Sequence, residues 1–525
     1  MDDRRERNTG RSGRESGSKR KIFRRTVFLM LVCGVGLFIP LIGQLWNIAI
    51  VHHEEYQAEA VEQQTRDVEV AAFRGSIYDS SGDVLAMSAT VYNLILSPRD
   101  LEASVDESKY KDEEGNADLT AYQAALQAKK VLDGVLAVLD LDREALADRL
   151  ERTYSQYEVL KTNIEKEQAE QLRAFITENK LSHFLYLTPT TKRYYPYGDL
   201  AAHVLGFCNS DGVGAYGLES EYEDVLAGTP GRVITLRNPL GDELPNDSST
   251  TYPAEDGNNL VLTIDANVQS VVEKYLKNAV EKWNVQQRGM AIVMDVNSGA
   301  ILAMAVEGGF DPNEPNVITD STLQSILDTE GALDEEQKGL LYRRLGVTSA
   351  EMAKEDYSLN QILADGVIDD DEYGTVQGMI RYAQWKNKCL TALYIPGSVF
   401  KVVTSAMGLD SGAATTATSF GCYGSFDVSG TQYGCASNAS HGVQDLATAL
   451  RNSCNIYYVQ LGQKIGAKTF YDYFKAFGFT EPTGIDLPSE TRYMQYYDEA
   501  GLGPVQLASS SFGQAQKITA LQTIT

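Results

Sequence analysis

The chain has 525 residues, enough for about three domains of average size. Its hydrophobic content of 43% is sufficient to fill packed cores, which excludes a chain that is disordered throughout. The net charge of -26 is unevenly spread, because residues 1–25 carry +6 and the remainder carries -32. Nucleic-acid binding needs basic surfaces, so the acidic body argues against nucleic acid as the main partner.

An uncharged run of 26 residues extends from Thr26 to Val51. As a helix it would be about 39 Å long, which spans a bilayer. The basic residues of the preceding segment place a disordered tail, residues 1–25, in the cytoplasm and everything after Val51 outside. A cleaved signal peptide has a shorter apolar region, and the cleavage-like Ala58-Glu59-Ala60 lies well past this run. The sequence therefore predicts an uncleaved, single-pass signal anchor over residues 26–51 of a cell-membrane protein.

Residues 52–257 are predicted to contain both strands and helices, and we find no catalytic pattern in residues 101–180. Two short apolar segments flank Asp79–Asp83, which predicts a hairpin. Charged and apolar positions alternate at helical spacing over residues 101–180, so accessory helices are expected there. The isolated His203 is expected to pack rather than to catalyse.

The pattern changes near residue 258, where a second domain is expected to begin and run to residue 525. A strand is predicted over Asn259–Ile264 and an amphipathic helix over Val268–Trp283. Two further strands, Met290–Val296 and Ala300–Val306, flank a short polar turn. This order of elements indicates an α/β or α+β fold. Residues 313–385 are acidic and helix-forming, and we interpret them as an insertion.

The six cysteines lack C-x-x-C spacing and the chain has only five histidines, so a structural zinc site is not expected. Cys422 and Cys435 flank a Gly/Ser-rich hairpin. A disulfide between them and two free thiols both fit the sequence.

One stretch after residue 390 has the pattern of a catalytic motif. Following Pro396-Gly397, apolar residues recur at helical spacing, so a buried helix is predicted to begin near Ser398. Ser398 and Lys401 would lie on one face, with the serine at the positive end of the helix dipole. A desolvated lysine can lose its proton and activate such a serine as a nucleophile. A capping serine followed by a solvated lysine explains so short a pattern better, so the rest of the chain must decide.

A second short pattern, Ser453-Cys454-Asn455, follows 55 residues later. Alone it is most often a turn or a helix cap. Its i,i+2 spacing does not place both polar residues on one helix face, so a loop or turn must present them. Cys454 in the middle is expected to pack.

From about residue 20 to its end, the chain resembles the class B penicillin-binding proteins. S-x-x-K followed by S-x-N is the pattern of penicillin-binding proteins and class A β-lactamases. The resemblance implies an α/β (α+β) penicillin-binding/β-lactamase-like transpeptidase domain over residues 258–525. It also implies an elongated α+β pedestal of the dimerisation type over residues 52–257, behind one transmembrane helix. It is carried by Arg74-Gly75, Asp79, Gly82, Leu85-Ala86, Arg193, Pro196, Gly198, Ala201, His203, Gly206, Gly217-Leu218-Glu219, Thr263-Ile264-Asp265 and Pro396-Gly397-Ser398 with Lys401.

The resemblance also implies D,D-transpeptidation of peptidoglycan. Ser398 would attack the penultimate D-Ala carbonyl of a D-Ala-D-Ala stem peptide, with its own backbone N–H as one oxyanion donor, and Lys401 would take the hydroxyl proton. Ser453 would relay a proton to the leaving group, and Asn455 would orient Lys401 or bind the substrate amide. β-Lactams would acylate the same serine, and no metal or organic cofactor is needed. The membrane, a glycosyltransferase and other wall-synthesis proteins are the expected partners.

The family's third motif, Lys-Thr/Ser-Gly, is not found in this sequence. Ser511-Phe512-Gly513-Gln514 resembles the stretch that precedes it, but the sequence stops at Thr525. Lys468-Thr469 is no substitute, because Phe470 follows. We expect a C-terminally truncated fragment. A D,D-carboxypeptidase or β-lactamase, and a catalytically dead scaffold or β-lactam sensor, remain as alternatives.

Overall fold

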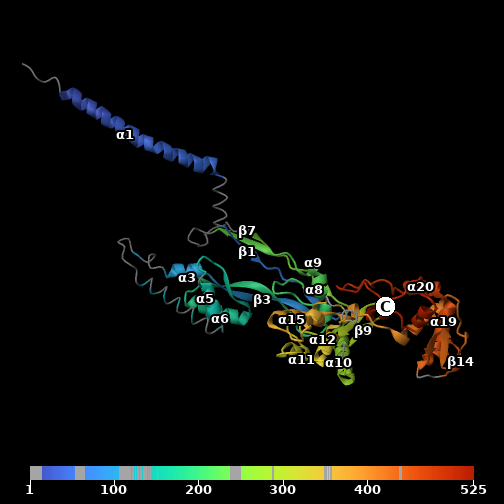
Figure 1. Cartoon of the computed structure of the whole chain (residues 1–525). Coiled ribbons are helices and arrows are strands. Elements are labelled where there is room, and N and C mark those ends of the chain that lie inside the picture. Colours follow the sequence, from blue (N-terminus) through green and yellow to red (C-terminus); the bar gives the residue numbers. More distant parts are fainter. Residues whose placement is uncertain are drawn as a thin grey trace, which may run out of the picture. The chain divides into compact units, whose positions relative to one another are not determined.

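The chain divides into two compact units, Met1–Val70 with Gly231–Pro253, and Ala71–Pro230 with Ala254–Thr525. Figure 1 labels many of their elements, among them α1 (Glu15–Trp46), β1 (Thr65–Val70) and β7 (Thr250–Tyr252) of the first unit and α10 (Ala266–Trp283) and α19 (Asn455–Ile465) of the second. The structure, a computed structural model, describes residues 15–53, 65–105, 143–150, 152–236, 250–285, 289–347, 357–436 and 440–525, with single positions between 111 and 141 and at 352 and 354.

The first unit holds a long helix and a small sheet. Helix α1 (Glu15–Trp46) continues into a π-helical turn, Asn47–Val51. Three antiparallel strands follow in the order β1 (Thr65–Val70), β6 (Gly231–Leu236) and β7 (Thr250–Tyr252). The helix begins ahead of the expected boundary at residue 26, and residues 1–14 lie outside the described part. Within the described residues we find no helix long and apolar enough to cross a membrane, so the signal anchor stays a prediction.

A five-stranded sheet begins the second unit. The predicted hairpin is confirmed, because β2 (Ile77–Tyr78) pairs antiparallel with β3 (Val84–Leu96). Strand β3 also pairs with β4 (Glu158–Ile164) and β5 (Leu185–Tyr194), and β2 pairs in parallel with β8 (Leu260–Val261). The helices of this region are α3 (Pro98–Ser104), α5 (Arg143–Leu150) and α6 (Lys166–Glu178).

Strand β4 corrects the expectation of helices throughout residues 101–180. Its buried Leu160 and Ile164 join the core beneath α6, whose buried Leu172 and Ile176 face the same cluster. The local pattern could not reveal this strand, because its partner β3 lies far away in sequence.

Three of the residues that carry the family resemblance, Arg74, Arg193 and Glu219, form a buried ion cluster. Glu219 is fully buried, and its carboxylate accepts from Arg74 Nε at 2.5 Å and from Arg193 Nε at 2.7 Å. Arg193 Nη1 also donates to the Gly75 carbonyl at 2.8 Å. A Cβ at Gly75 would lie 1.9 Å from the Asn258 carbonyl oxygen, so only glycine allows this approach. Short helices surround the cluster: α7 (Ala202–Leu205), α8 (Gly217–Glu221) and α9 (Glu223–Leu226).

Asp79 ties the hairpin turn to the next domain. Its carboxylate accepts from the backbone N–H groups of Ser81 and Asp83, both at 2.8 Å, and from that of Ala266 at 3.1 Å. Burial by itself would raise the pKa of the Asp79 carboxyl, but the hydrogen bonds from Ala266, Ser81 and Asp83 outweigh it and lower the pKa to about 2. His203 has the packing role that was expected, since its ring contacts Phe310 edge-on.

The second domain opens much as the sequence predicts. Helix α10 (Ala266–Trp283) precedes an antiparallel pair, β9 (Met290–Met294) and β10 (Ile301–Val306). The expected strand over 259–264 is shorter and is the β8 edge of the first sheet. Helices α16 (Lys388–Thr391) and α22 (Ala520–Ile524) contact β9.

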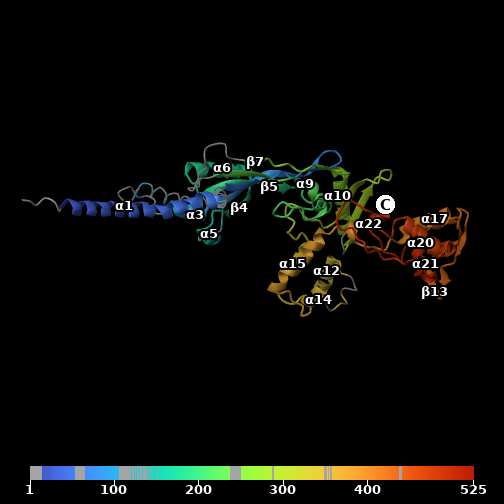
Figure 2. The same ribbon diagram turned by 90° about the horizontal axis from the view of Figure 1, so that it is seen from above.

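Residues 313–385, which the sequence led us to interpret as an insertion, form helices from Ser321 onward. These are α11 (Ser321–Leu327), α12 (Glu335–Leu345), α14 (Ser358–Ile362) and α15 (Asp370–Trp385). Figure 2 shows α12, α14 and α15 gathered together, and they share an apolar core with α11.

A helical region after residue 396 carries the candidate site. It contains α17 (Phe400–Asp410), α18 (Leu446–Arg451), α19 (Asn455–Ile465), α20 (Ala467–Ala476) and α21 (Pro504–Ser511). Strands β11 (Phe420–Cys422) and β14 (Gly442–Gln444) pair beside them, as do β12 (Ser425–Val428) and β13 (Thr431–Gly434). Phe400, Met407 and Tyr457 belong to the buried core that holds these elements together.

Candidate active site

Ser398 lies in a 3₁₀ turn, Gly397–Val399, that leads directly into α17. The helix therefore begins where the sequence predicts. Gly397 has φ +62°, and its N–H donates to the Gly513 carbonyl at 2.9 Å. A Cβ at Gly513, which has φ +85°, would lie 2.1 Å from the Gly397 carbonyl oxygen. The serine turn is thus held by a backbone contact that only glycine at position 513 permits.

Lys401 brings the four predicted site residues together. Its side chain is 1% exposed, and Nζ lies 3.1 Å from Ser398 Oγ. From the other side Nζ contacts Ser453 Oγ at 2.9 Å, the Ser453 carbonyl at 2.8 Å and Asn455 Oδ1 at 2.7 Å. All four residues therefore meet at one nitrogen.

The surroundings of Lys401 make its proton easier to remove. Burial lowers the pKa of the Lys401 ammonium below its usual value, although attraction to the sulfurs of Cys435 and Cys454 acts in the opposite direction. A neutral amine has two N–H donors and one lone pair. Two carbonyl-type oxygens, from Ser453 and Asn455, accept the two N–H groups. The lone pair is then left for a proton from a nearby hydroxyl, which is what a general base requires.

Ser453 and Asn455 are presented by a turn, as their spacing demanded. Ser453 has φ +48°, and Cys454 then acts as the N-cap of α19, which begins at Asn455. The Cys454 Sγ accepts from the Tyr457 N–H at 3.4 Å. Because Ser453 has a left-handed conformation and the next helix begins at Asn455, the side chains of both residues point toward Lys401.

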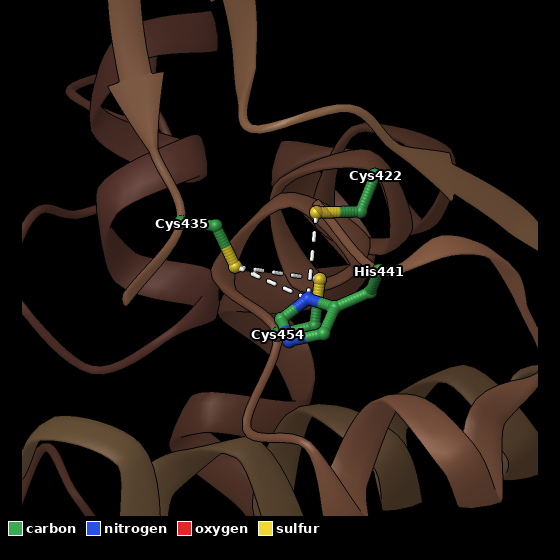
Figure 3. Close-up of side chains that lie close together, drawn as sticks. All are labelled: Cys422, Cys435, His441 and Cys454. Atoms are coloured by element: carbon green, nitrogen blue, oxygen red, sulfur yellow. Dashed lines mark hydrogen bonds between the residues drawn. The ribbon is translucent and has the colours of Figure 1, made fainter. Parts of the chain in front are cut away.

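A cluster of three thiols and one imidazole lies directly behind this turn and was missed from the sequence. Cys422, Cys435, His441 and Cys454 offer ligand atoms that all lie within 4.8 Å of one another, and Figure 3 shows the four side chains converging. The structure forms no disulfide between Cys422 and Cys435, which was one of the two states that the sequence allowed. The available signal was the spacing C-x12-C-x5-H-x12-C, which a search for C-x-x-C overlooks.

Comparison with known proteins agrees with the fold and the motifs. Residues 289–525 match the family model for the penicillin-binding protein transpeptidase domain, and residues 69–262 match that for the penicillin-binding protein dimerisation domain. Stage V sporulation protein D of Bacillus subtilis is 25% identical over 505 residues, covering 95% of this chain and 64% of the relative. The probable peptidoglycan D,D-transpeptidase PenA of Neisseria gonorrhoeae is 24% identical over 510 residues, covering 95% and 70%.

The solved complex between penicillin-binding protein PBP2 and MreC from Helicobacter pylori contains a similar fold. The TM-score is 0.59 at 20% identity, over 87% of this chain and 75% of that one. Fold and motifs together define a penicillin-binding protein in which a dimerisation-type domain precedes a transpeptidase-type domain. The chain belongs to the class B penicillin-binding proteins. It spans just under two thirds of the length of the Bacillus relative.

Proposed function

We propose that this protein cross-links peptidoglycan by D,D-transpeptidation through an acyl-enzyme on Ser398. The observation that carries the proposal is the buried Lys401 amine, 3.1 Å from Ser398 Oγ and fixed by oxygens of Ser453 and Asn455. The family match and the name of the Neisseria relative support the same reaction class.

The first half-reaction forms the acyl-enzyme. Ser398 Oγ bonds to the penultimate D-Ala carbonyl carbon as its proton passes to Lys401 Nζ. Collapse of the tetrahedral intermediate breaks the amide C–N bond, and terminal D-Ala leaves with a proton supplied through Ser453, whose Oγ lies 2.9 Å from Nζ. The ester on Ser398 keeps the rest of the stem peptide.

The second half-reaction transfers the acyl group. An amine from a neighbouring stem peptide attacks the ester carbonyl and gives a proton to Lys401. A new amide C–N bond forms as the ester C–O bond breaks, and Ser398 Oγ regains its proton from Lys401. A β-lactam would acylate Ser398 in the same way, because its strained amide takes the place of the D-Ala-D-Ala bond.

We further propose that residues 26–51 anchor the protein in the cell membrane with the domains outside. The uncharged run and the preceding basic residues support this orientation. Wall-synthesis proteins would then contact the dimerisation-type domain; the Helicobacter relative was solved with MreC. Sedimentation of the full chain with membranes, and its release after deletion of residues 1–51, is the expected result. Equal solubility of both forms would contradict the anchor.

The function is tested with protein expressed from its complete gene, a stem pentapeptide donor and an amine acceptor. Wild type should form the cross-linked amide, and Ser398→Ala should not. Ser411→Ala, which replaces an exposed serine at the end of α17, is the matched control and should behave as wild type. Release of D-Ala without cross-linked product would instead indicate a carboxypeptidase. Unchanged cell-wall growth with Ser398→Ala in a strain that needs the protein would favour a scaffold.

A further inference from the structure

The geometry of the thiol–imidazole cluster, Cys422, Cys435, His441 and Cys454, matches a ligand shell. The Sγ atoms of Cys435 and Cys454 are 3.7 Å apart, and His441 Nδ1 lies 3.5 Å from the sulfurs of both Cys422 and Cys435. Around a tetrahedral Zn²⁺ with Zn–S bonds near 2.3 Å, neighbouring sulfurs lie about 3.8 Å apart. The donors are therefore already spaced as they would be around one ion.

The chemistry of the cluster selects the class of metal. Three sulfurs and one imidazole nitrogen form a soft donor set that favours Zn²⁺ over Mg²⁺ or Ca²⁺. Buried cysteines alone often serve as small apolar residues. Here, however, a histidine directs one ring nitrogen at two sulfurs, which apolar packing does not explain. The N–H of Tyr457 donates to Cys454 Sγ, a contact that supports a thiolate ligand.

The four ligands come from separate segments that a metal would join. Cys422 ends β11, and Cys435 follows β13, where its N–H donates to the Gly424 carbonyl at 3.0 Å. His441 directly precedes β14, whose Gly442 pairs with Cys422. Cys454 caps α19. An ion at this point would fasten the β12–β13 hairpin and the β11–β14 pair to the start of α19.

The site has a direct connection to the candidate catalytic residues. Cys454 is the residue between Ser453 and Asn455, and both of these contact Lys401 Nζ. Asn455 Nδ2 also lies 3.4 Å from the carbonyl of Gly434, the residue before Cys435. Fixing Cys454 and Cys435 therefore fixes the oxygens that orient the lysine amine.

We propose that Cys422, Cys435, His441 and Cys454 bind one Zn²⁺ ion, which holds Ser453 and Asn455 against Lys401. The metal site stands independently of the proposed function, whereas its effect on acylation rests on that function. The four ligands are positioning residues, since none of them is asked to touch the substrate.

Metal content tests the site without any assay of activity. Protein expressed from its complete gene, purified under reducing conditions without chelator and supplied with Zn²⁺, should hold one zinc per chain by elemental mass spectrometry. Cys435→Ser and His441→Ala should lose it. Cys389→Ser, which changes a buried thiol outside the cluster, is the matched control and should retain it. Absence of zinc from wild type with all thiols reduced, or equal zinc in Cys435→Ser, would overturn the site.

Restoring activity with added zinc distinguishes a role of the metal in positioning Lys401 from a loss of folding. Removal of zinc by a chelator should slow acylation by a fluorescent penicillin by at least about tenfold, the usual effect of disturbing the shell that orients a site. Zinc added back should restore the rate in wild type and not in Cys435→Ser. Zinc-independent acylation would refute the link to Lys401. Zinc binding without any acylation would instead count against the proposed function and leave the metal site intact.

A disulfide is the competing use of these thiols. Its sulfurs would have to approach to about 2.05 Å, whereas the sulfurs of Cys435 and Cys454 lie 3.7 Å apart. Mass spectrometry of the protein purified under anaerobic conditions should find three unpaired thiols. A bond between any two of them under those conditions would contradict the metal site.

Discussion

Replacing Lys401 by Gln tests the base that the site geometry implies. Glutamine is polar and of similar length but cannot take a proton from Ser398. The change removes the 3.1 Å contact to Ser398 Oγ and the 2.9 Å contact to Ser453 Oγ as routes for that proton. General-base catalysis is worth about 10²–10⁴ in rate, or about 2.7–5.4 kcal/mol of transition-state stabilisation. We expect acylation by penicillin to slow by that factor.

The assay is the second-order rate of acylation by a fluorescent penicillin, measured across pH. In wild type the rate should rise with pH as Lys401 loses its proton, with a midpoint below the ordinary lysine value of 10.5 because burial lowers this pKa. The variant should lack that rise. Lys464→Gln, which changes an exposed lysine on α19, is the matched control and should keep both the rate and the pH profile.

Two results would refute the reasoning about Lys401. One is a Lys401→Gln variant that is folded and acylated within about tenfold of the wild-type rate, which is less than a general base contributes. The other is a wild-type rate that does not depend on pH below the ordinary lysine pKa, because a protonated lysine would then be compatible with the reaction.

Three further predictions concern the buried ion cluster, the serine turn and the Asp79 carboxylate. Glu219→Gln should lower the free energy of unfolding, measured in urea, by about 3–5 kcal/mol, because two buried arginines lose their carboxylate partner. The control Glu221→Gln, which changes an exposed carboxylate, should alter it by less than about 0.5 kcal/mol. Equal effects of the two variants would contradict the buried ion cluster. Gly513→Ala should slow acylation and destabilise the fold, since its Cβ would meet a backbone oxygen at 2.1 Å. The control is Gly412→Ala, because Gly412 has a similar φ but open space around it; this variant should show only a backbone strain of about 1–3 kcal/mol. A normal acylation rate in Gly513→Ala would show that the contact between Gly513 and the Gly397 carbonyl is dispensable. The pKa of the Asp79 carboxyl is lowered from 3.8 to about 2 in the folded protein, so the stability that this group contributes is present above pH 3.8 and is lost as pH falls through about 2. Between these pH values the melting temperature of wild type should therefore decrease more steeply than that of Asp79→Asn. Parallel curves would contradict the lowered pKa of Asp79.

Local spacing was sufficient to predict part of the site. An S-x-x-K pattern after a Pro-Gly turn predicted that Ser398 and Lys401 share a helix face, because i and i+3 positions always do. The i,i+2 spacing of Ser453 and Asn455 required a turn, and the left-handed Ser453 provides it. The hairpin after residue 76 and the helices of residues 313–385 could also be predicted, because their sequence patterns lie within short segments of the chain.

The remainder depends on contacts between distant residues. Glu219 meets Arg74 from 145 positions away, and nothing in either segment encodes that meeting. Strand β4 has the same problem, because its pairing with β3 decides its structure. The thiol–imidazole cluster unites four segments at spacings that match no short zinc motif. Only a fold that places the start of α19 beside the β12–β13 hairpin and the β11–β14 pair brings these ligands together.

The most direct test of the central claim is to identify the residue that penicillin acylates. Protein expressed from its complete gene is treated with a β-lactam, digested, and mapped by tandem mass spectrometry. The account predicts a single adduct, on Ser398, that is absent when Lys401 is replaced by Gln and the exposure is brief. An adduct on another residue, or a folded protein that forms none, would contradict a serine acyl-enzyme at this site.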